Sequence, residues 1–560
     1  MEKLLILSVF TLAAVIQLVS GFSYCPQGCQ CSDVQLKVVC GEGNLDVLPI
    51  ALNPSIKELI IVKNSIKIID SSIQFYSDLQ VFDLSGNELV NIPSKTFLYQ
   101  RNLQQLHLNE NKISSISNKT FLGLSSLKVL SMERNFIGQL KYGQFVPTAL
   151  LEELNLGTNR ISSIEPNTFN GLHHLRILNL EDNLLTTVPS ASFKGIPRLS
   201  ELLLGINSFK TVPGKSFEAF RSLKVLSLKG VGMYNLSHDA FKGLETLVSL
   251  DLSSNLLKKI PTVQLSSLRR LEELQIGQNV FEMVAYSAFF GLKNLKTLEI
   301  TGSLKLKKID NGAFLANPNL ESINLSSNKM LVEIDDSAFS GLPNLKHLIL
   351  RDNSLTTIQE TLYPFNQLTT FDVSENPLVC DCNILWLKNL LSSANTIKST
   401  ISMPNVLCRS GQPLSILTPQ LMGCDFDEHR KQAMVAAFLV GSAASLTALA
   451  LIAYKCKSKL DRMKMNTKEK LHHQQHYVYA TSDHQFYNHH NHKQHQQQQQ
   501  QQQHFIQIQH PYYATQPIYT DGTRIYNHQD LGRVMNFSRP PLPPPPALSL
   551  LSPTTSLSSL

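Results

Sequence analysis

The chain has 560 residues, of which 42% are hydrophobic and 17% are charged, and its formal net charge is +7. Residues from 455 onward carry eleven Lys and Arg against five Asp and Glu, which leaves 39 against 38 in the rest of the chain. The basic excess is therefore confined to the C-terminal segment, so the charge does not indicate a nucleic-acid partner.

The amino terminus has the pattern of a secretory signal peptide. Residues 1–21 read MEKLLILSVFTLAAVIQLVSG, with one lysine, an apolar run and small residues before a cleavage site that we place after Gly21. A signal anchor retained in the membrane is the alternative reading. Because Cys25 opens a cysteine-rich segment only four residues later, we expect the leader to be removed.

Fourteen copies of one pattern fill residues 56–378. Each copy has apolar residues at positions 1, 4, 6 and 11 and usually asparagine at position 9, as in LQQLHLNENKI from Leu103. Successive copies begin 23 to 25 residues apart, which indicates one stacked structural unit. The copies begin at Ile56, Leu79, Leu103, Leu127, Leu151, Leu175, Leu199, Leu223, Leu247, Leu271, Leu295, Leu320, Leu345 and Leu368.

Each copy is expected to open with a short strand, because Leu106 and Leu108 alternate with polar residues. In most copies a phenylalanine follows about eighteen residues after the first apolar position. A single unit is too small to enclose these side chains, so neighbouring units are expected to bury them in one continuous core. The phenylalanines are Phe97, Phe121, Phe145, Phe169, Phe193, Phe217, Phe241, Phe289, Phe314 and Phe339.

A third column consists of asparagines, whose side chains can satisfy backbone groups at tight turns. Val231 and Ser303 replace asparagine in the copies that begin at Leu223 and Leu295, so we expect the column to be weaker or distorted there. The asparagines are Asn87, Asn111, Asn135, Asn159 and Asn183.

Residues 25–424 resemble the extracellular leucine-rich repeat family, which implies a curved solenoid with parallel strands on its concave face. CPQGCQC and NPLVCDCNILWL are similar to the cysteine-rich N- and C-terminal caps of that family, and we place the caps at residues 22–55 and 379–424. Zinc binding by these cysteines is the competing reading, which the secretory context disfavours. Trp386 is expected inside the second cap. The resemblance implies disulfides between Cys25 and Cys31, Cys29 and Cys40, Cys380 and Cys408, and Cys382 and Cys424.

One membrane-spanning helix is predicted. Residues 433–454 contain no charge and would form a helix of about 33 Å, enough to cross a bilayer. Seven Lys and Arg follow between residues 455 and 470, whereas only two lie in the linker at 425–432. The positive-inside rule therefore predicts a type I plasma-membrane protein with an extracellular amino terminus. Cys456, on the cytoplasmic side, is either palmitoylated or a free thiol.

Residues 455–560 lack apolar periodicity and are rich in His, Gln and Pro, which predicts a disordered cytoplasmic tail without a kinase or another globular signalling domain. Its proline run is typical of ligands for EVH1, WW or SH3 domains, and its last three residues fit a PDZ domain. Both motifs are short, and such runs also occur without a specific partner. The candidate docking residues are Pro540, Pro541, Leu542, Pro543, Pro544, Ser558 and Leu560.

The sequence contains no catalytic motif and no metal-ligand spacing, so we expect neither an enzyme nor a cofactor. Function is then expected on the exposed solenoid faces, and the N-terminal half of the concave face is predicted to be acidic and to bind a protein. A solvated surface without a partner is the alternative. The acidic residues are Glu110, Glu133, Glu153, Glu181, Asp182 and Glu201.

Three extracellular sequons are predicted to carry glycans, at Asn118, Asn235 and Asn324. Asn324 lies between Ile323 and Leu325, which places it on the concave face. A glycan there would block a protein partner. We therefore expect the binding face to lie in the copies from Leu79 to Leu271.

The layout of caps, repeats, one membrane helix and a short tail resembles single-pass repeat receptors of the Capricious and Tartan type in insects. That resemblance implies a recognition or adhesion receptor that binds an extracellular protein, or the same protein on another cell, and relays the event through tail-bound adaptors. The alternatives are a co-receptor or ligand sink for a secreted factor, and a membrane-anchored structural or organising protein. Deleting the tail separates the first from the second, because a sink needs the membrane helix only as an anchor.

Overall fold

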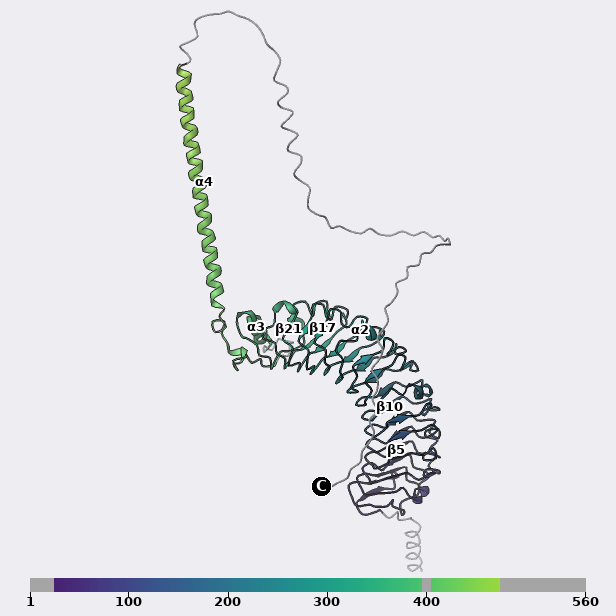
Figure 1. Cartoon of the computed structure of the whole chain (residues 1–560). Helices are drawn as coiled ribbons and strands as arrows, with labels where there is room; N and C mark the ends of the chain where they lie inside the picture. The colour runs from purple at the N-terminus through teal and green to yellow at the C-terminus, as the bar shows by residue number, and fades with distance from the viewer. Residues whose placement is uncertain (1–24, 395–403, 474–560) are drawn as a thin grey trace, which may run out of the picture. The chain divides into compact units, whose positions relative to one another are not determined.

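The computed structural model describes residues 25–394 and 404–473 (Figure 1). The predicted signal peptide, residues 395–403 of the C-terminal cap, and the tail from residue 474 with its docking motifs lie outside the described residues. The chain separates into two compact units, Met1–Ala448 and Leu449–Leu560.

One 16-stranded sheet runs through the first unit, and all its pairings are parallel except that between β1 and β2. Fourteen of its strands belong to the repeats, which confirms the fourteen copies seen in the sequence. The order in the sheet is β1 (Cys29–Ser32), β2 (Lys37–Cys40), β3 (Glu58–Ile61), β4 (Val81–Asp83), β5 (Gln105–His107), β6 (Val129–Ser131), β8 (Glu153–Asn155), β10 (Ile177–Asn179), β11 (Glu201–Leu203), β13 (Val225–Ser227), β15 (Ser249–Asp251), β16 (Glu273–Gln275), β18 (Thr297–Glu299), β20 (Ser322–Asn324), β22 (His347–Ile349) and β23 (Thr370–Asp372).

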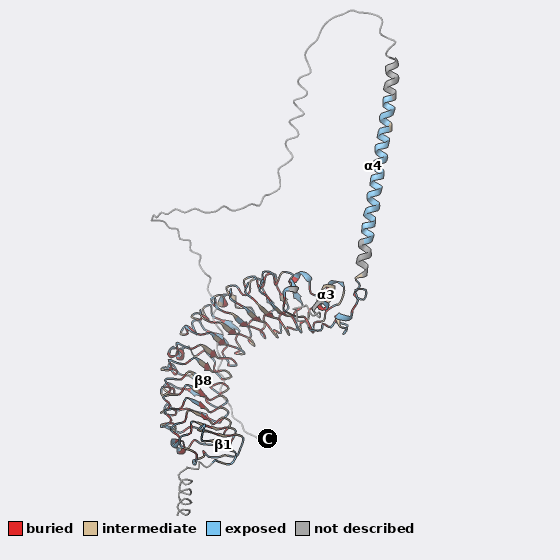
Figure 2. Cartoon of the chain, turned by 180° about the vertical axis from the view of Figure 1, so that it is seen from behind, coloured by how far each residue is buried: buried red, intermediate tan, exposed pale blue. Residues whose placement is uncertain are grey.

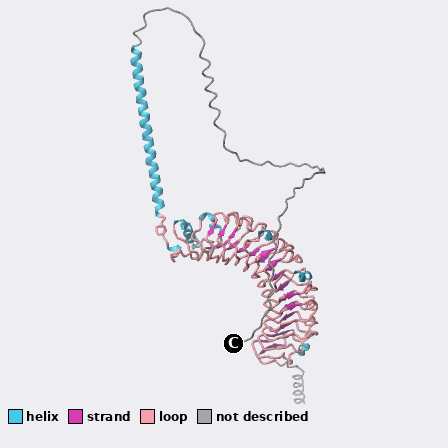
Figure 3. Cartoon of the chain, viewed as in Figure 1, coloured by secondary structure: helices cyan, strands magenta, loops and turns pink. Residues whose placement is uncertain are grey.

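The other side of most repeats carries a short strand or a helical turn. Figure 3 shows that the solenoid is curved and that short helical turns lie on its outer rim, α2 (labelled in Figure 1) among them, so the main sheet occupies the inner side of the repeats. The short strands form three small parallel sheets: β7 (Gln139–Leu140) with β9 (Ser163–Ile164), β12 (Thr211–Val212) with β14 (Asn235–Leu236), and β17 (Met283–Val284) with β19 (Lys308–Ile309) and β21 (Glu333–Ile334). The helical segments of the repeats are η1 (Ser71–Phe75), η2 (Ser190–Gly195), α2 (Thr262–Leu265), η3 (Glu360–Leu362) and η4 (Phe365–Gln367).

The core is a ribbon of stacked layers between these two sides, where buried residues line every repeat (Figure 2). The predicted phenylalanine column is fully buried, and neighbouring rings stack across repeats. The ring centroids of Phe145 lie 6.0 Å from those of both Phe121 and Phe169. The displaced rings Phe314 and Phe339 also stack, at 5.5 Å. Each layer is therefore completed only by its neighbours, as expected for a repeat solenoid.

The asparagine column forms a hydrogen-bonded ladder. Asn135 is typical: its Nδ2 donates to the backbone oxygens of Leu108, Met132 and Glu133, and its Oδ1 accepts from the Ile113 amide. The ladder is interrupted at the two predicted positions. Val231 offers no polar group, and the buried hydroxyl of Ser303 has no hydrogen-bond partner among the described residues.

Disulfides staple both ends of the solenoid. They join Cys25 to Cys31, Cys29 to Cys40, Cys380 to Cys408, and Cys382 to Cys424, which are the pairs that the family resemblance implies. The C-terminal end also contains η5 (Cys382–Ile384), α3 (Leu385–Ala394) and η6 (Leu414–Ile416). Trp386 of α3 stacks on Phe365 with ring centroids 4.7 Å apart, and its Nε1 donates to the Ile358 oxygen over 3.2 Å. The single tryptophan therefore joins the cap to the last repeats.

The long helix α4 (Asp425–His473) extends beyond the predicted membrane span on both sides. Within it, Gln432–Lys464 is long and apolar enough, by length and composition, to cross a membrane. The helix therefore includes the segment 425–432, where the sequence predicts a linker, and continues to His473, past the predicted start of the tail at residue 455. Residues 425–473 contain no proline and many good helix formers, so no residue type in this stretch forces the helix to end.

Candidate binding faces of the solenoid

The strand residues that flank each buried leucine form two columns on the inner side of the solenoid. Parallel pairing in exact repeat register places His107 beside Ser131, and Asn155 beside Asn179. The column on the C-terminal side of the leucines consists of Asp83, His107, Ser131, Asn155, Asn179, Leu203, Ser227, Asp251, Gln275, Glu299 and Asn324. Side chains one repeat apart are therefore direct neighbours on this face.

Several polar residues of this column also have a structural role that sequence reasoning missed. Asn155 Oδ1 accepts a hydrogen bond from the amide of Gly157, and Asn179 Oδ1 accepts one from Glu181. Asp251 and Asn324 do the same for Ser253 and Ser326. A polar residue at this position therefore stabilises the turn that follows the strand, whether or not it also contacts a binding partner.

Two of the predicted acidic residues share one arginine. Arg134 lies 3.4 Å from Glu110 and 3.8 Å from Glu133 in the closest nitrogen–oxygen contacts. Glu133 is further held by Asn155, whose Nδ2 donates to its Oε2 over 3.0 Å. Arg134 therefore offsets part of the negative charge of Glu110 and Glu133, and the three side chains together keep one net negative charge.

The remaining four acidic residues lie in three successive repeats. Glu153 and Glu201 belong to one column of the sheet, separated by Ile177 of the intervening strand. Glu181 and Asp182 lie in the turn that follows that intervening strand, and Asp182 has a positive φ of 54°. None of the four forms an ion pair with any residue that the structure describes. They define an acidic patch: Glu153, Glu181, Asp182 and Glu201.

Two glycines without positive φ, Gly157 and Gly205, leave room for polar side chains beside and within this patch. A Cβ on Gly157 would lie 2.9 Å from Asn179 Nδ2 and 3.3 Å from Asn155 Oδ1. A Cβ on Gly205 would lie 2.9 Å from Glu181 Oε1 and 3.1 Å from the Lys229 backbone oxygen. The polar side chains therefore lie over the backbone of both glycines.

We expect Gly205→Ala to destabilise the solenoid by about 1 kcal/mol, because the new methyl group displaces Glu181 and presses on the Lys229 backbone. Gly138→Ala is the matched control, since a Cβ there meets nothing within 4 Å. Thermal unfolding of the two variants measures the difference. Equal midpoints would show that the turn at Gly205 adjusts freely.

At the outer margin of the sheet, lysines and glutamates of adjacent repeats form exposed ion pairs. Lys296 lies 2.7 Å from Glu272, and the hydrogen bond between them raises the pKa of Lys296. Lys346 lies 2.7 Å from Glu321 and lowers the pKa of that carboxyl through its hydrogen bond. Such exposed pairs add little stability, and they leave this part of the margin without net charge.

The three predicted glycosylation sites occupy different places. Asn118 and Asn235 are exposed, and Asn235 lies in the short strand β14, away from the main sheet. Asn324 lies in β20 of the main sheet, and its Oδ1 already accepts from Ser326. Its Nδ2, the atom that would carry a glycan, belongs to a partly exposed side chain on the inner face.

No group of three His, Cys, Asp or Glu side chains within residues 25–394 and 404–473 is placed to hold a metal ion. Cys456 is an exposed free thiol in α4.

A disulfide-capped solenoid of parallel strands defines a class of repeat protein that uses its exposed faces for recognition. The leucine rich repeat family matches residues 77–137, 101–161, 149–209, 221–281, 269–330 and 318–378, which together cover more than half of the chain. The protein belongs to the leucine-rich repeat family.

The chain is also similar to Protein toll of Drosophila melanogaster, with 36% identity over 73 residues, or 11% of this chain and 6% of that protein. Among solved structures, TLR13 in its complex with ssRNA13 gives a TM-score of 0.52 at 25% identity, over 67% of this chain and 63% of that one. The Toll–Spatzle complex of Drosophila gives 0.51 at 21% identity, over 67% and 62%. This chain thus spans less than two thirds of each of these proteins.

Proposed function

We propose that this protein is a cell-surface recognition receptor that binds a protein partner through the inner face of its solenoid. The observation that carries the proposal is the acidic patch of Glu153, Glu181, Asp182 and Glu201, which repeat stacking gathers on one face without compensating ion pairs among the described residues. A partner with a basic surface would be steered to this patch.

The solved structures similar to this chain include one bound to single-stranded RNA and one bound to the protein Spatzle. Charge favours the second kind of ligand here. RNA presents a negative phosphate backbone, and proteins that bind it supply lysine and arginine along its path. The acidic patch would repel phosphate, which supports a protein partner.

The proposed topology is that of a type I plasma-membrane protein. Its support is the single candidate span Gln432–Lys464 among the described residues, together with the lysines that follow residue 454 in the sequence. In this arrangement the solenoid is extracellular and the sequons at Asn118, Asn235 and Asn324 are accessible to glycosylation. The proline run and the terminal Ser-x-Leu remain candidate docking sites for cytoplasmic adaptors.

The proposed layout of caps, repeats, membrane helix and short tail resembles that of Capricious- and Tartan-type receptors, and adhesion between cells is the specific form of recognition that we propose. A mixing assay tests it with full-length protein. Red and green cells that both express the protein should sort together and exclude uncoloured cells that lack it. Dispersed cells would rule out homophilic adhesion and direct the search to a different partner.

A co-receptor or ligand sink is the second candidate, because such a protein needs its membrane helix only as an anchor. Removing residues 474–560 while keeping α4 intact separates the two. Loss of the cellular response with unchanged partner binding supports a relaying receptor. An unchanged response supports the sink.

Charge reversal of the acidic patch should weaken partner binding. We expect the triple substitution Glu153→Lys, Glu181→Lys and Glu201→Lys to reduce binding by about a hundredfold, since each lost attraction becomes a repulsion. Surface binding to cells that express each variant measures the effect.

The matched control reverses three exposed acidic residues elsewhere on the solenoid: Asp78, Glu245 and Asp336. The control should bind as the unaltered protein does. If the two triple variants bind equally well, the acidic patch is a solvated surface and the partner binds elsewhere.

A further inference from the structure

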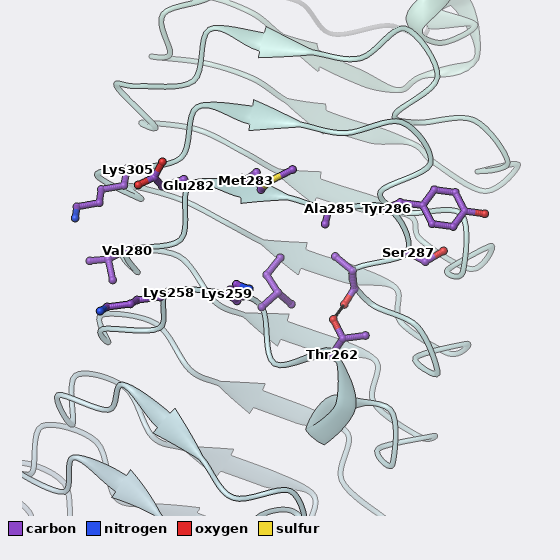
Figure 4. A pocket seen from close by; sticks show the side chains of 12 residues that line it. Lys258, Lys259, Thr262, Val280, Glu282, Met283, Ala285, Tyr286, Ser287 and Lys305 are labelled. Carbon is purple, nitrogen blue, oxygen red and sulfur yellow. Dashed lines mark hydrogen bonds between the residues drawn. The ribbon is translucent and has the colours of Figure 1, made fainter. Parts of the chain in front are cut away.

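A groove with a volume of about 760 Å³ lies on the side of the repeats away from the main sheet. It is formed by the repeats that begin at Leu247, Leu271 and Leu295 (Figure 4). Figure 4 shows Lys258, Val280 and Lys305 toward one end and Tyr286 with Ser287 toward the other. The groove therefore runs along the direction of the short strand β17.

The strand β17 has a free edge that faces this groove. Elsewhere, short strands are joined by backbone hydrogen bonds, such as that from the Ser237 amide to the Val212 oxygen at 3.1 Å and that from Asp310 to Val284 at 2.9 Å. In the repeat that begins at Leu271, the amide at the position of Ser237 and Asp310 is that of Ala285. Among the described residues, no backbone hydrogen bond joins β17 to residues 258–260 of the preceding repeat.

The preceding repeat cannot supply the missing strand. The Ile260 oxygen, which the Ala285 amide would otherwise reach, accepts instead from the Thr262 amide over 2.9 Å, and the helix α2 begins at Thr262. On its other side, Pro261 has no amide hydrogen to donate to the Leu236 oxygen, and Gln264 Nε2 donates there over 3.1 Å. The two repeats are instead bridged at the end of the groove by Thr262 Oγ1, which donates to the Ala288 oxygen over 2.6 Å. The small outer sheet is thus open on one side.

The groove combines an apolar surface with positive charge. Met283 is 44% exposed and Tyr286 is 63% exposed, although both are large apolar side chains. Lys258, Lys259 and Lys305 line the groove and form no ion pair with any described residue. Its one carboxylate, Glu282, is paired with Lys307 at 3.1 Å. The lining therefore keeps a net positive charge.

We propose that this groove binds an extended peptide segment of a partner protein, in which acidic residues flank a large apolar side chain, as a strand added to the free edge of β17. Main-chain hydrogen bonds to an open strand edge give affinity for a peptide of almost any sequence. The three lysines select acidic residues, and Met283 with Tyr286 contacts the apolar side chain.

A sulfated glycan would also be attracted by the lysines, but two observations favour the peptide. A polysaccharide has no regular row of amide and carbonyl groups to pair with β17. It also gains little from the exposed surfaces of Met283 and Tyr286, which provide apolar contact area. The glycan is therefore an outcome of the test rather than the expected ligand.

The experiment uses full-length protein in detergent micelles and an array of nine-residue peptides. Each peptide has two acidic residues at either end and five central positions drawn from Val, Ile, Leu, Phe and Tyr. We expect binders in this array and none in a matched array with lysine at the ends. For the tightest binder, the triple substitution Lys258→Glu, Lys259→Glu and Lys305→Glu should lower affinity at least about tenfold. Methylating alternate peptide amides on the strand-pairing side should do the same.

The triple substitution Lys119→Glu, Lys210→Glu and Lys229→Glu is the control, since these lysines are exposed and lie outside the groove. It should leave peptide affinity within about twofold. Absence of binders, an equal loss in the control, or undiminished binding of the methylated peptides would overturn the proposal. So would low-molecular-mass heparin that binds this site while no peptide does.

Discussion

Replacing Asn135 by alanine should open the solenoid locally in the repeats around it. The side chain is 3% exposed and makes four hydrogen bonds to backbone groups, three through Nδ2 and one through Oδ1. Alanine leaves the Ile113 amide and the oxygens of Leu108, Met132 and Glu133 without that partner. Because buried unsatisfied groups cost about 1–3 kcal/mol each and water can reach some of them, we expect a net loss of about 3 kcal/mol.

Amide hydrogen exchange measures this loss directly, because a loss of about 3 kcal/mol in the free energy of local opening accelerates exchange roughly a hundredfold. The acceleration should be confined to peptides from the repeats that contain residues 108–137. Peptides from the C-terminal repeats should exchange at their original rate, since each repeat contacts only its neighbours.

Ser303→Ala is the matched control at another position of the same ladder. The Ser303 hydroxyl is buried without a partner, so its removal takes away an unsatisfied group and should leave stability unchanged or raise it by about 1 kcal/mol. If Asn135→Ala exchanges no faster than the unaltered protein, the ladder is not a source of stability.

Much of the fold follows from the repeat period alone. Fourteen copies of one pattern predict fourteen parallel strands, a buried phenylalanine column and an asparagine ladder, and the described residues contain all three. The period is informative because every unit depends on its neighbours for its core, so the same side chain must recur at the same place.

Ion pairs between adjacent repeats could also have been predicted from the sequence. Finding them requires a comparison of residues one repeat apart rather than of near neighbours in the chain. Glu110 and Arg134 are 24 residues apart and form an ion pair, as do Glu272 and Lys296. Counting acidic residues within one face overlooked these cations. The same comparison leaves Glu153 and Glu201 without an opposite charge in the intervening strand, where Ile177 stands.

The groove could be located only in part from the sequence. Its signal is Leu265, which occupies the place of phenylalanine in the copy that begins at Leu247, together with Pro261 shortly before it. These residues predict an irregular outer turn. The free edge of β17 could not be predicted, because it depends on whether residues 258–260 of the preceding repeat form a strand beside it.

The extent of α4 shows a different limit. Hydropathy marks the segment that can cross a membrane, but it does not mark where a helix ends in water. Helix α4 continues through charged residues after Tyr454 because such residues have good helix propensity and no proline interrupts them.

Replacing Phe145 by alanine should have the largest effect on stability. The ring is fully buried and stacks on Phe121 and Phe169 at 6.0 Å on either side, so its removal leaves a cavity shared by three repeats. Substitutions of this type cost about 3–5 kcal/mol. Because the repeats are coupled mainly to their neighbours, we expect the middle of the solenoid to open at lower urea concentration than its C-terminal end.

Two measurements on the same samples show whether the middle of the solenoid opens before its C-terminal end. Limited proteolysis reports cleavage within residues 121–169, and Trp386 fluorescence reports the C-terminal end, where that ring stacks on Phe365. Phe136→Ala is the control: Phe136 is 42% exposed under the Arg160 guanidinium, 4.3 Å from its ring centre, and should cost at most about 1 kcal/mol. If Phe145→Ala shifts proteolysis and Trp386 fluorescence together, the solenoid unfolds as one cooperative unit. If it shifts neither, the phenylalanine column does not hold the repeats together.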